Sequence, residues 1–405
     1  MKLPAAPWQT RRGMPRLLRA LGAGKGETRF VGGCVRDTLL GLEVSDVDLA
    51  TRLQPQEVMK RLEAAGIKAV PTGLAHGTVT AVINGAPVEV TTLRRDVATD
   101  GRRATIAYTE DWREDAARRD FTINALMADP GDGEVHDFFG GLQDLEARRV
   151  RFIGDPLVRI AEDHLRILRF FRFHARFGAG PPDRHALRAC AARANDLMAL
   201  SRERIADELI KVLALDDPTA SVRLMIRHGI LKPVLPEIDS ADALAPLPRR
   251  EKAAAVAPDG LRRLGALLPA QTEVAAEVGA RLRLSNAAKT RLTCIANREG
   301  RSPEDPRLLA YYVGIICAVD RLLLETDLKA AQAAKRIALI RDWQKPRLPV
   351  GGGELIAMGL APGPQVAATM QAIEREWTRS GFSADKAEVR ALARRYVDQA
   401  LRESA

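Results

Sequence analysis

The pattern of apolar and polar positions divides the chain into two parts of different periodicity. Between residues 28 and 144, short apolar runs of strand length alternate with amphipathic stretches, which predicts a mixture of strands and helices. From Pro156 onward, apolar positions recur with a helical period almost to the end of the chain. We therefore predict an α+β fold, with a mixed-sheet region over residues 1–150 and all-α regions over 151–238 and 239–405.

Within the mixed region, short apolar runs predict strands and amphipathic stretches predict helices. The predicted strands are Phe30–Val31, Val47–Ala50, Gly77–Asn84 and Pro87–Thr92, and the predicted helices are Val35–Leu40 and Pro55–Ala65. Asn84-Gly85 is a strong signal for a two-residue hairpin turn between the last two strands. The segment Leu93–Glu110 is charged and lacks periodicity, so we predict a mobile loop close to the site.

In the helical part, Pro156 follows an aspartate N-cap and opens a helix that we predict to run through Arg172. Residues 239–258 are rich in proline, alanine and charge, which indicates a linker or loosely ordered connection. Helices resume after it, and residues 345–364 contain a second group of glycines and prolines that indicates a hinge. A last amphipathic helix is predicted at about 365–380.

The string FVGGCVRDTLLGLEVSDVDLA carries the first candidate chemistry. Gly32 and Gly33 follow a strand and allow the backbone to approach a triphosphate closely, and Arg36 can clamp phosphate with two hydrogen bonds. Asp46 and Asp48 are two residues apart on a predicted strand and therefore project side by side. Two parallel carboxylates repel each other unless a cation lies between them, which favours a divalent metal site. The alternative is a glycine turn followed by a solvated acidic strand end.

Glu89 lies between Val88 and Val90 in the last predicted strand of the mixed region. This apolar–acid–apolar pattern can bring a third carboxylate beside the aspartate pair and makes Glu89 a candidate catalytic residue. A solvent-facing glutamate on an edge strand is an equally reasonable interpretation.

The string DAARRDFTINA follows the predicted loop. Paired arginines Arg118 and Arg119 beside Asp120, at the start of an apolar helix, can hold triphosphate and ribose. Asn124 in the same string is a further candidate for nucleotide binding. The alternative interpretation is a salt-bridged helix entrance.

The string EDHLRILRFFRF places Asp163 and Arg166 three residues apart on the predicted helix. An aspartate can accept from an exocyclic amine and an arginine can donate to ring acceptors, so this pair can recognise a base edge without a nucleic-acid template. We expect Arg169 to orient the pair. Arg172 is expected nearly opposite Asp163 on the helix, in a more structural role. As a bare pattern, the pair is usually an intrahelical salt bridge.

Amino-acid composition and net charge add little to these predictions. The 405 residues carry a formal net charge of +10, with arginine far more common than lysine, which favours a polyanionic partner but is also produced by an arginine-rich genome. The four cysteines are scattered, so we predict reduced buried thiols in a cytosolic protein and no zinc site. No signal peptide and no membrane-spanning run is recognised.

The ordered strings GGCVRD, DVDLA, ARRDFTINAL, DFFGGLQDL and EDHLRILRFFRF resemble those of the class II tRNA nucleotidyltransferase and bacterial poly(A) polymerase family. The segment GELIAMGLAPGPQVAATMQAIEREW is similar to the tail of the CCA-adding members. The resemblance implies a polymerase-beta-like nucleotidyltransferase head with a mixed sheet over 1–150. It further implies an all-α neck with the base-reading helix over 151–238, and a tRNA-binding body and tail over 239–405.

The resemblance also implies the chemistry of the site. Asp46 and Asp48 are expected to hold two Mg²⁺ ions, and Glu89 is kept as a possible third carboxylate. The residues expected to bind nucleotide are Gly32, Gly33, Arg36, Arg118, Arg119, Asp120, Asn124, Asp163, Arg166, Arg169 and Arg172. The expected activity is template-independent addition of C, C and A from CTP and ATP to the tRNA acceptor arm in the cytoplasm, without a membrane partner.

Two alternatives to CCA addition stay open at this point. The shared motifs do not separate a CCA-adding enzyme from a bacterial poly(A) polymerase, or from an enzyme that adds only C or only A. A non-catalytic RNA-binding protein with a degenerate head is the alternative from another class, although the intact DVD and RRD strings disfavour it.

Overall fold

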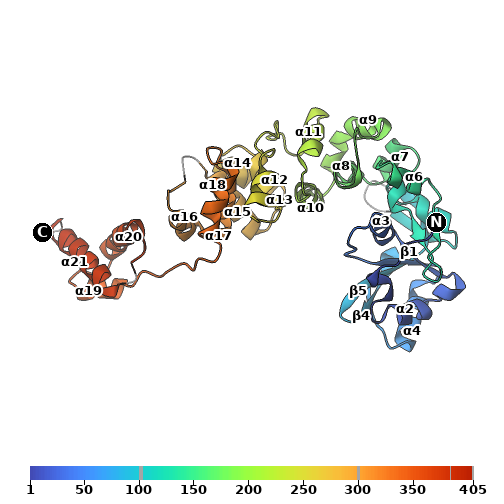
Figure 1. Ribbon diagram of the computed structural model, residues 1–405, viewed down its shortest axis with the longest axis horizontal. Helices are drawn as coiled ribbons and strands as arrows, with labels where there is room; N and C mark the ends of the chain where they lie inside the picture. The colour runs from blue at the N-terminus through green and yellow to red at the C-terminus, as the bar shows by residue number, and fades with distance from the viewer. Residues whose placement is uncertain (100–103, 299–301, 384, 404–405) are drawn as a thin grey trace. The chain divides into compact units, whose positions relative to one another are not determined.

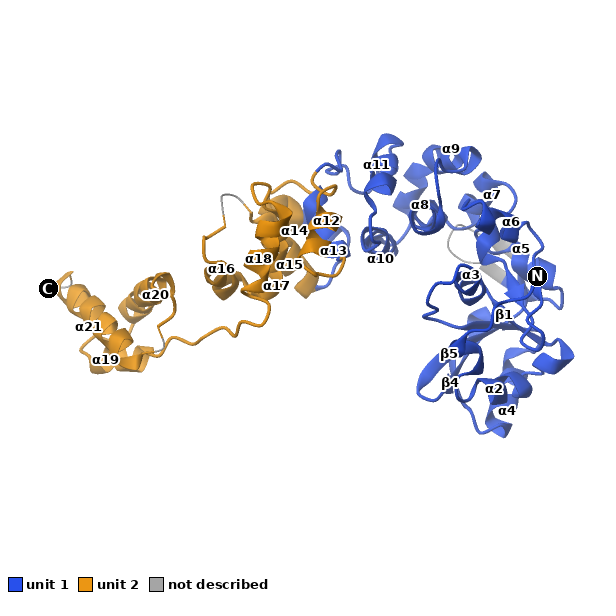
Figure 2. Cartoon of the chain, in the orientation of Figure 1, with its two compact units in different colours: residues 1–242, 259–267, 277–285 blue, residues 243–258, 268–276, 286–405 orange. Residues whose placement is uncertain are grey.

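The computed structural model describes residues 1–405 except 100–103, 299–301, 384 and 404–405 (Figure 1). The described chain forms two compact units (Figure 2). Unit 1 contains residues 1–242, 259–267 and 277–285, and unit 2 contains residues 243–258, 268–276 and 286–405. No helix in the described part of the chain is long and apolar enough to cross a membrane.

A seven-stranded mixed sheet forms the centre of the first 150 residues, with strand order β3-β4-β5-β2-β1-β8-β9. The strands are β1 (Thr28–Val31), β2 (Asp48–Thr51), β3 (Lys68–Gly73), β4 (Thr78–Ile83), β5 (Ala86–Thr92), β8 (Met127–Ala128) and β9 (Val135–His136). β2 and β5 are parallel neighbours, whereas the other pairs are antiparallel. The predicted mixed sheet is therefore confirmed.

Helices and short 3-10 turns connect and cover these strands. They are α1 (Pro7–Thr10), α2 (Met14–Ala20), η1 (Ala23–Lys25), α3 (Gly33–Leu39), α4 (Pro55–Ala64), η2 (Leu74–His76), α5 (Trp112–Ala117), η3 (Thr122–Asn124) and α6 (Gly141–Glu146). Both α2 and α4 pack against β4 (Figure 1). Asn84 and Gly85 join β4 to β5 with φ angles of 51° and 78°, as the predicted two-residue hairpin requires.

The prediction of a loop over residues 93–110 is wrong for most of that segment. β6 (Arg94–Thr99) and β7 (Ala104–Tyr108) pair as a separate antiparallel ribbon, with Arg94 opposite Tyr108 and Thr99 opposite Ala104. The centre of the predicted loop, residues 100–103, lies outside the described residues. A two-stranded ribbon needs backbone hydrogen bonds but no buried face, so its sequence need not show apolar alternation.

The helices that follow the sheet in unit 1 are α7 (Pro156–Glu162), α8 (Arg166–Phe177), α9 (Arg184–Ala192), η4 (Ala194–Ala199), α10 (Arg202–Leu213), α11 (Thr219–Arg227) and α13 (Gly260–Leu267). The predicted single helix from Pro156 through Arg172 is wrong, because the chain leaves helical geometry at Asp163, with φ −151° and ψ 106°. Buried aromatic rings of α8, including Phe170 and Phe173, pack against Phe121 and fix α8 beside the sheet region.

Unit 2 is helical throughout its described residues, apart from the connecting segments. Its helices are α12 (Leu247–Ala253), α15 (Asn286–Ala296), α16 (Pro306–Val313), α17 (Ile315–Leu324), α18 (Ala330–Ala338), α19 (Gly352–Ala357), α20 (Pro364–Arg379) and α21 (Lys386–Glu403), while α14 (Thr272–Arg281) is divided between the units. The predicted linker over 239–258 contains α12 and buries Leu244 and Leu247. The predicted hinge over 345–364 contains the short helix α19.

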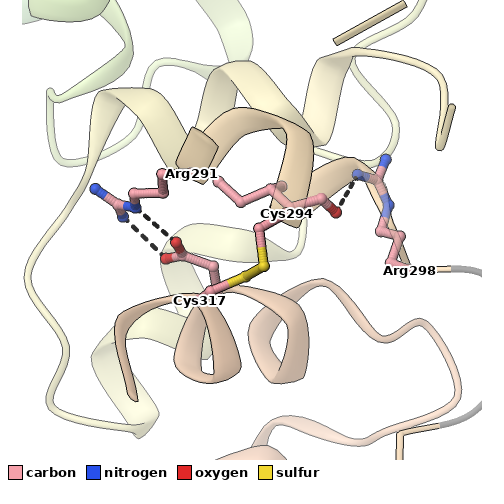
Figure 3. The surroundings of a disulfide bond; sticks show 6 residues. Arg291, Cys294, Arg298 and Cys317 are labelled. Atoms are coloured by element: carbon pink, nitrogen blue, oxygen red, sulfur yellow. Dashed lines mark hydrogen bonds and ion pairs between the residues drawn. A yellow bond between two sulfur atoms is a disulfide. The ribbon is translucent and has the colours of Figure 1, made fainter. Parts of the chain in front are cut away.

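Two of the four cysteines contradict the prediction of reduced thiols. Cys294 on α15 and Cys317 on α17 form a disulfide in unit 2, beside the two-pronged ion pair between Arg291 and Asp320 (Figure 3). The pairing could not be read from the sequence, because the cysteines are 23 positions apart with a helix between them and only the packing of the helices brings them together. Cys34 and Cys190 are buried free thiols, and burial raises the pKa of both.

Reduction of the disulfide is expected to destabilise the protein by about 3 kcal/mol. The cross-link closes a loop of 23 residues and so restricts the unfolded chain, which is the main source of disulfide stabilisation in the chain-entropy description. Urea denaturation with and without reductant measures the loss. A Cys294→Ser, Cys317→Ser double variant is the control, because reductant should not destabilise it further. An unchanged wild-type midpoint after reduction would contradict the expectation.

Candidate active site

A polar cavity of about 620 Å³ in unit 1 brings the candidate residues together. Its lining residues are Gly32, Gly33, Arg36, Asp37, Ser45, Asp46, Asp48, Arg118, Arg119, Asp120, Asn124, Asp163, Arg166, Arg169, Arg172, Phe173 and Arg176. All of the residues that the sequence assigns to nucleotide or metal binding are in this set, whereas Glu89 is not. The cavity therefore combines seven arginines with a few carboxylates, which suits a polyanionic ligand that carries a cation.

The aspartate pair lies where the chain enters β2. Asp48 is the first residue of the strand, and the exposed Asp46 precedes the strand instead of lying on it. The Asp46 carboxylate accepts a hydrogen bond from Ser45 Oγ at 2.9 Å. Glu89 is the partner of Asp48 in the parallel β2–β5 register, so the strands bring this third acid beside the pair without adding it to the cavity wall.

The electrostatics of Asp48 fit a bound cation. Burial raises the pKa of Asp48 to about 6, and the negative charges of Glu89 and Asp46 add to the rise while Arg119 opposes it. A carboxylate whose ionised form is disfavoured by burial and by neighbouring acids gains most from a positive charge, and oxygen ligands suit divalent cations. Among the described residues, no group of three or more histidine, cysteine, aspartate or glutamate side chains is arranged to hold a metal ion. Asp46 and Asp48 both line the cavity and form the candidate pair.

The glycine turn before α3 has a conformational requirement at one position. Gly32 has φ +70°, and a Cβ there would lie 3.1 Å from Arg119 Nη1 and 3.6 Å from the carbonyl oxygen of Asn124. The left-handed backbone conformation therefore favours glycine, and a larger residue would also displace the end of the Arg119 side chain slightly. A Cβ on Gly33 would meet only Arg36 Nη2 at 3.7 Å, an ordinary contact, so packing does not impose glycine there.

Arg36 on α3 is buried and held by its neighbours. It forms an ion pair with Asp37 at 2.7 Å and donates a hydrogen bond to Asn124 Oδ1. Its guanidinium carbon also lies 4.1 Å from the centre of the Phe177 ring. Burial lowers the pKa of Arg36, while Asp37 opposes the change. The side chain is thus ordered at the cavity wall, in a position to meet phosphate.

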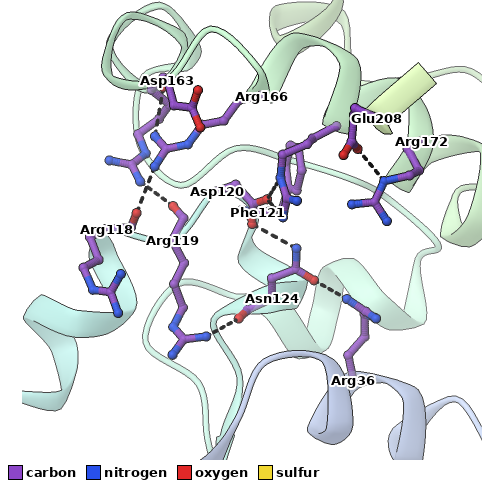
Figure 4. Close-up of polar contacts among 12 residues, drawn as sticks. Arg36, Arg118, Arg119, Asp120, Phe121, Asn124, Asp163, Arg166, Arg172 and Glu208 are labelled. Carbon is purple, nitrogen blue, oxygen red and sulfur yellow. Dashed lines mark hydrogen bonds and ion pairs between the residues drawn. The ribbon is translucent and has the colours of Figure 1, made fainter. Parts of the chain in front are cut away.

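Asp120 links the sheet region to α8. Its carboxylate accepts from Arg169 Nε at 2.8 Å and from Asn124 Nδ2 at 2.9 Å. Figure 4 shows this chain of contacts continuing from Asn124 to Arg36. Arg169 therefore contacts the aspartate of the RRD string and not Asp163, which it was expected to orient. The contacts fix four of the candidate nucleotide-binding side chains relative to one another.

Ionised Asp120 is expected to stabilise the fold until the pH is strongly acidic. Burial alone would raise its pKa, but Arg169 and Asn124 hold the pKa at about 2, below the ordinary value of 3.8. Because the folded pKa is the lower one, the carboxylate contributes about 2 kcal/mol above pH ~4, and this contribution is lost as the pH falls from ~4 to ~2. Urea denaturation should show the stability advantage of wild type over Asp120→Asn shrinking in that range. A pH-independent difference would contradict the assignment.

The break between α7 and α8 changes the predicted base-reading pair. Asp163 does not pair with Arg166; both of its carboxylate oxygens accept from Arg204 of α10, at 3.0 and 2.8 Å, and Oδ1 also accepts from Leu165 N at 3.1 Å. Arg166 donates to the carbonyl oxygen of Arg118 at 3.1 Å and pairs with Glu162. The Asp163–Arg166 salt bridge of the alternative interpretation is therefore absent, since Asp163 pairs with Arg204 and Arg166 with Glu162, and both side chains line the cavity.

The position expected for Arg172 is wrong. The expectation that it faces away from Asp163 assumed one continuous helix, but the break before α8 places Asp163 and Arg172 in the wall of the same cavity. Glu208 of α10 pairs with Arg172 (Figure 4). Arg172 is thus held at the cavity by a neighbouring helix.

Sequence reasoning missed several residues that shape the site. Arg204 and Glu208 lie one turn apart on α10 and hold Asp163 and Arg172, respectively. The missed residues of the cavity wall are Asp37, Ser45, Phe173 and Arg176. The four-residue spacing of Arg204 and Glu208 indicated a shared helix face, but nothing local indicated which residues that face would meet.

Comparisons with known proteins agree with this geometry. Residues 28–151 match a family model described as the poly A polymerase head domain, and residues 182–242 match one described as a probable RNA and SrmB-binding site of polymerase A. Mitochondrial CCA tRNA nucleotidyltransferase 1 of Mus musculus is 32% identical over 404 residues, covering 96% of this chain and 92% of the mouse protein. The CCA-adding enzyme of Levilactobacillus brevis is 33% identical over 364 residues, covering 86% of this chain and 88% of that protein.

Solved structures share the fold. The CCA-adding enzyme of Bacillus stearothermophilus in complex with CTP matches with a TM-score of 0.73 at 24% identity, covering 96% of this chain and 99% of that one. The Thermotoga maritima CCA-adding enzyme complexed with tRNA matches with a TM-score of 0.65 at 20% identity, covering 100% of this chain and 99% of that one. The 32% identity to the mouse protein, over 96% of this chain and 92% of that protein, shows that the chain belongs to the CCA tRNA nucleotidyltransferase family.

Proposed function

We propose that this chain adds C, C and A to the 3′ end of tRNA, using CTP and ATP and no nucleic-acid template. The observation that carries the proposal is the single cavity that joins Asp46 and Asp48 to the arginines of the RRD string and to Asp163 and Arg166. The sequence relatives bear the names CCA tRNA nucleotidyltransferase and CCA-adding enzyme. Solved structures of the same fold contain CTP, ATP or tRNA.

The carboxylate pair is proposed to hold two Mg²⁺ ions through Asp46 and Asp48, with Glu89 as the adjacent third acid. When bound, the ions would activate the primer 3′-hydroxyl and neutralise charge on the triphosphate, as in two-metal phosphoryl transfer. The raised pKa of Asp48 and the oxygen-only donor set support this assignment. The finding that Glu89 lies beside Asp48 in register supports an electrostatic role for Glu89.

The remaining residues of the cavity bind and orient the reactants. Arg118, Arg119 and Arg36, with the glycine turn at Gly32 and Gly33, are proposed to hold the triphosphate and ribose. In-line positioning and charge neutralisation are sufficient for phosphoryl transfer, so none of the histidines is assigned a role as base. Asp163 and Arg166 are proposed to read the base edge, with Arg169 and Arg172 lining the same wall.

The parts outside the head are proposed to bind the tRNA acceptor arm through phosphates and shape. The match of residues 182–242 to an RNA-binding family model supports this assignment for α9 to α11. We propose a head at 1–150, a neck at 151–238 and a body and tail at 239–405, although the chain clusters into two compact units. The cytoplasmic location stays a prediction, since the mouse relative is named as mitochondrial.

Incubation of the protein with Mg²⁺ and a tRNA that lacks its CCA end tests this proposal. CTP alone should extend the tRNA by two nucleotides, and ATP should add one more only after the two C residues are present. A poly(A) polymerase would instead extend an unstructured RNA from ATP alone. Absence of any Mg²⁺-dependent incorporation would favour a non-catalytic RNA-binding protein.

A further inference from the structure

Asp115 on α5 is a buried acid that contacts the active site without lining it. Its side chain is only 1% exposed, and it is not part of the cavity wall. Oδ1 accepts from Arg118 Nε at 2.8 Å, and Oδ2 accepts from Arg119 Nη2 at 3.2 Å. One carboxylate thus holds both arginines of the RRD string, each of which does line the cavity.

The same carboxylate reaches the β6–β7 ribbon. The backbone N–H of Arg94, the first residue of β6, donates to Asp115 Oδ1 at 3.3 Å. At the same end of the ribbon, Thr109 N, which follows β7, donates to the carbonyl oxygen of Leu93 at 3.0 Å. The base of the ribbon and the two arginines therefore share one buried anchor.

The two arginines continue from this anchor into the site. Arg119 Nη1 donates to the carbonyl oxygen of Asn124 at 3.4 Å, packs over Gly32, and acts electrostatically on Asp48. The carbonyl oxygen of Arg118 accepts from Arg166 at 3.1 Å, so the same segment also supports the base-reading side. A shift of this segment would alter triphosphate and base contacts together.

The negative charge of Asp115 is secure at neutral pH. Burial alone would raise its pKa, but Arg119 and Arg118 lower the pKa below its ordinary value. An ionised acceptor forms stronger hydrogen bonds with guanidinium groups than a neutral acceptor does. The hydrogen bonds from Arg118 and Arg119 to Asp115 are therefore charge-assisted.

We propose that Asp115 is a positioning residue: it fixes Arg118 and Arg119 for nucleotide binding and ties them to the base of the β6–β7 ribbon. The inference rests on the proposed function of the site. It attributes the positions of Arg118 and Arg119 to Asp115, a residue that does not line the cavity. Loss of this geometry weakens the binding of CTP and of ATP, because both nucleotides present the same triphosphate and ribose.

The direction of the change in KM distinguishes a positioning role of Asp115 from a purely electrostatic one. Removing a negative charge near a triphosphate site would by itself tighten nucleotide binding. Asp115→Asn weakens the anchor, because the amide nitrogen cannot accept from Arg119 and the uncharged amide oxygen forms a weaker hydrogen bond with Arg118 than the carboxylate does. Asp115→Asn is therefore expected to raise KM for CTP and ATP about tenfold or more, with a smaller change in kcat.

Asp320 in unit 2 provides the control. It is a buried acid, 0% exposed, that accepts from Arg291 Nε at 2.7 Å and from Arg291 Nη2 at 3.0 Å, and it does not line the cavity. Asp320→Asn should lower the urea midpoint as Asp115→Asn does, and it should leave KM for CTP near the wild-type value. A KM for Asp115→Asn that equals that of Asp320→Asn, or falls below wild type, would overturn the positioning role.

The ribbon contact is tested with a second substitution. Asn can still accept from Arg94 N, whereas Asp115→Ala removes that acceptor as well. Amide hydrogen exchange at Arg94 should therefore be faster in Asp115→Ala than in Asp115→Asn, and equal exchange would refute the contact between Asp115 and the ribbon.

Titration of each variant with CTP in the absence of tRNA measures nucleotide affinity directly. If the wild-type protein binds CTP but adds no nucleotide to tRNA, the proposed function is wrong. The CTP titrations of the wild type and the variants still test the positioning role of Asp115 in that case.

Discussion

Asp48→Asn is expected to reduce nucleotide incorporation roughly a thousandfold or more while the protein keeps its fold and its affinity for tRNA. Asp48 is the carboxylate that faces the cavity at the start of β2, where its charge serves a cation and not the packing of the sheet. In the absence of divalent cations the variant should be as stable as wild type or more so, because the change relieves repulsion from Glu89 and Asp46. Single-turnover assays at saturating Mg²⁺ and urea denaturation measure the two effects.

Asp46→Asn should show the same loss of activity, because Asp46 is the second proposed ligand. Glu89→Gln is the informative comparison, since Glu89 lies beside Asp48 in the sheet but outside the cavity wall. A loss as large as that of Asp48→Asn would make Glu89 a ligand, and a small loss would restrict it to an electrostatic role. Wild-type turnover in Asp48→Asn would refute the metal assignment.

The second large effect is expected on base selection. Asp163→Ala should reduce the preference for CTP and ATP over UTP and GTP by about tenfold to a hundredfold, because a good bidentate base contact contributes ~1–3 kcal/mol of discrimination. Asp163 lines the cavity beside Arg166 and is held there by Arg204. Competition among the four triphosphates on a tRNA primer measures the change.

Asp155→Ala is the control for the structural role of Asp163. Asp155 is the N-cap of α7 and accepts from Leu157 N, and Asp163 accepts from Leu165 N in the turn before α8. Loss of either backbone hydrogen bond should cost about 1 kcal/mol of stability, but Asp155 does not line the cavity. Unchanged selectivity in Asp163→Ala, with a stability loss at least as large as that of Asp155→Ala, would restrict Asp163 to a structural role.

The sequence predicted those parts of the site whose geometry is local. Strand periodicity and the glycine turn were sufficient to place Gly32, Arg36 and Asp48 in one wall, because all three lie within the β1–α3–β2 segment. The Asn84-Gly85 turn was predictable for the same reason, since its backbone conformation follows from two adjacent residues. The mixed sheet followed from the alternation of strand and helix patterns.

Features that depend on distant residues were not predictable. No glycine or proline marks the helix break at Asp163; the break is accompanied by the contact with Arg204, 41 residues later in the chain. The position of Arg172 and the role of Glu208 depend on the same packing of α10 against α8. The disulfide between Cys294 and Cys317 likewise depends on the packing of two helices in unit 2.

One site is expected to add C, C and A in order and then stop. Sequencing the 3′ ends of a tRNA that lacks CCA, after incubation with this protein, Mg²⁺ and all four triphosphates, tests it most directly. The dominant product is expected to carry a three-nucleotide extension that reads CCA, and Asp48→Asn is expected to leave the tRNA unextended. A heterogeneous run of A residues, or an unextended tRNA with the wild-type protein, would contradict it.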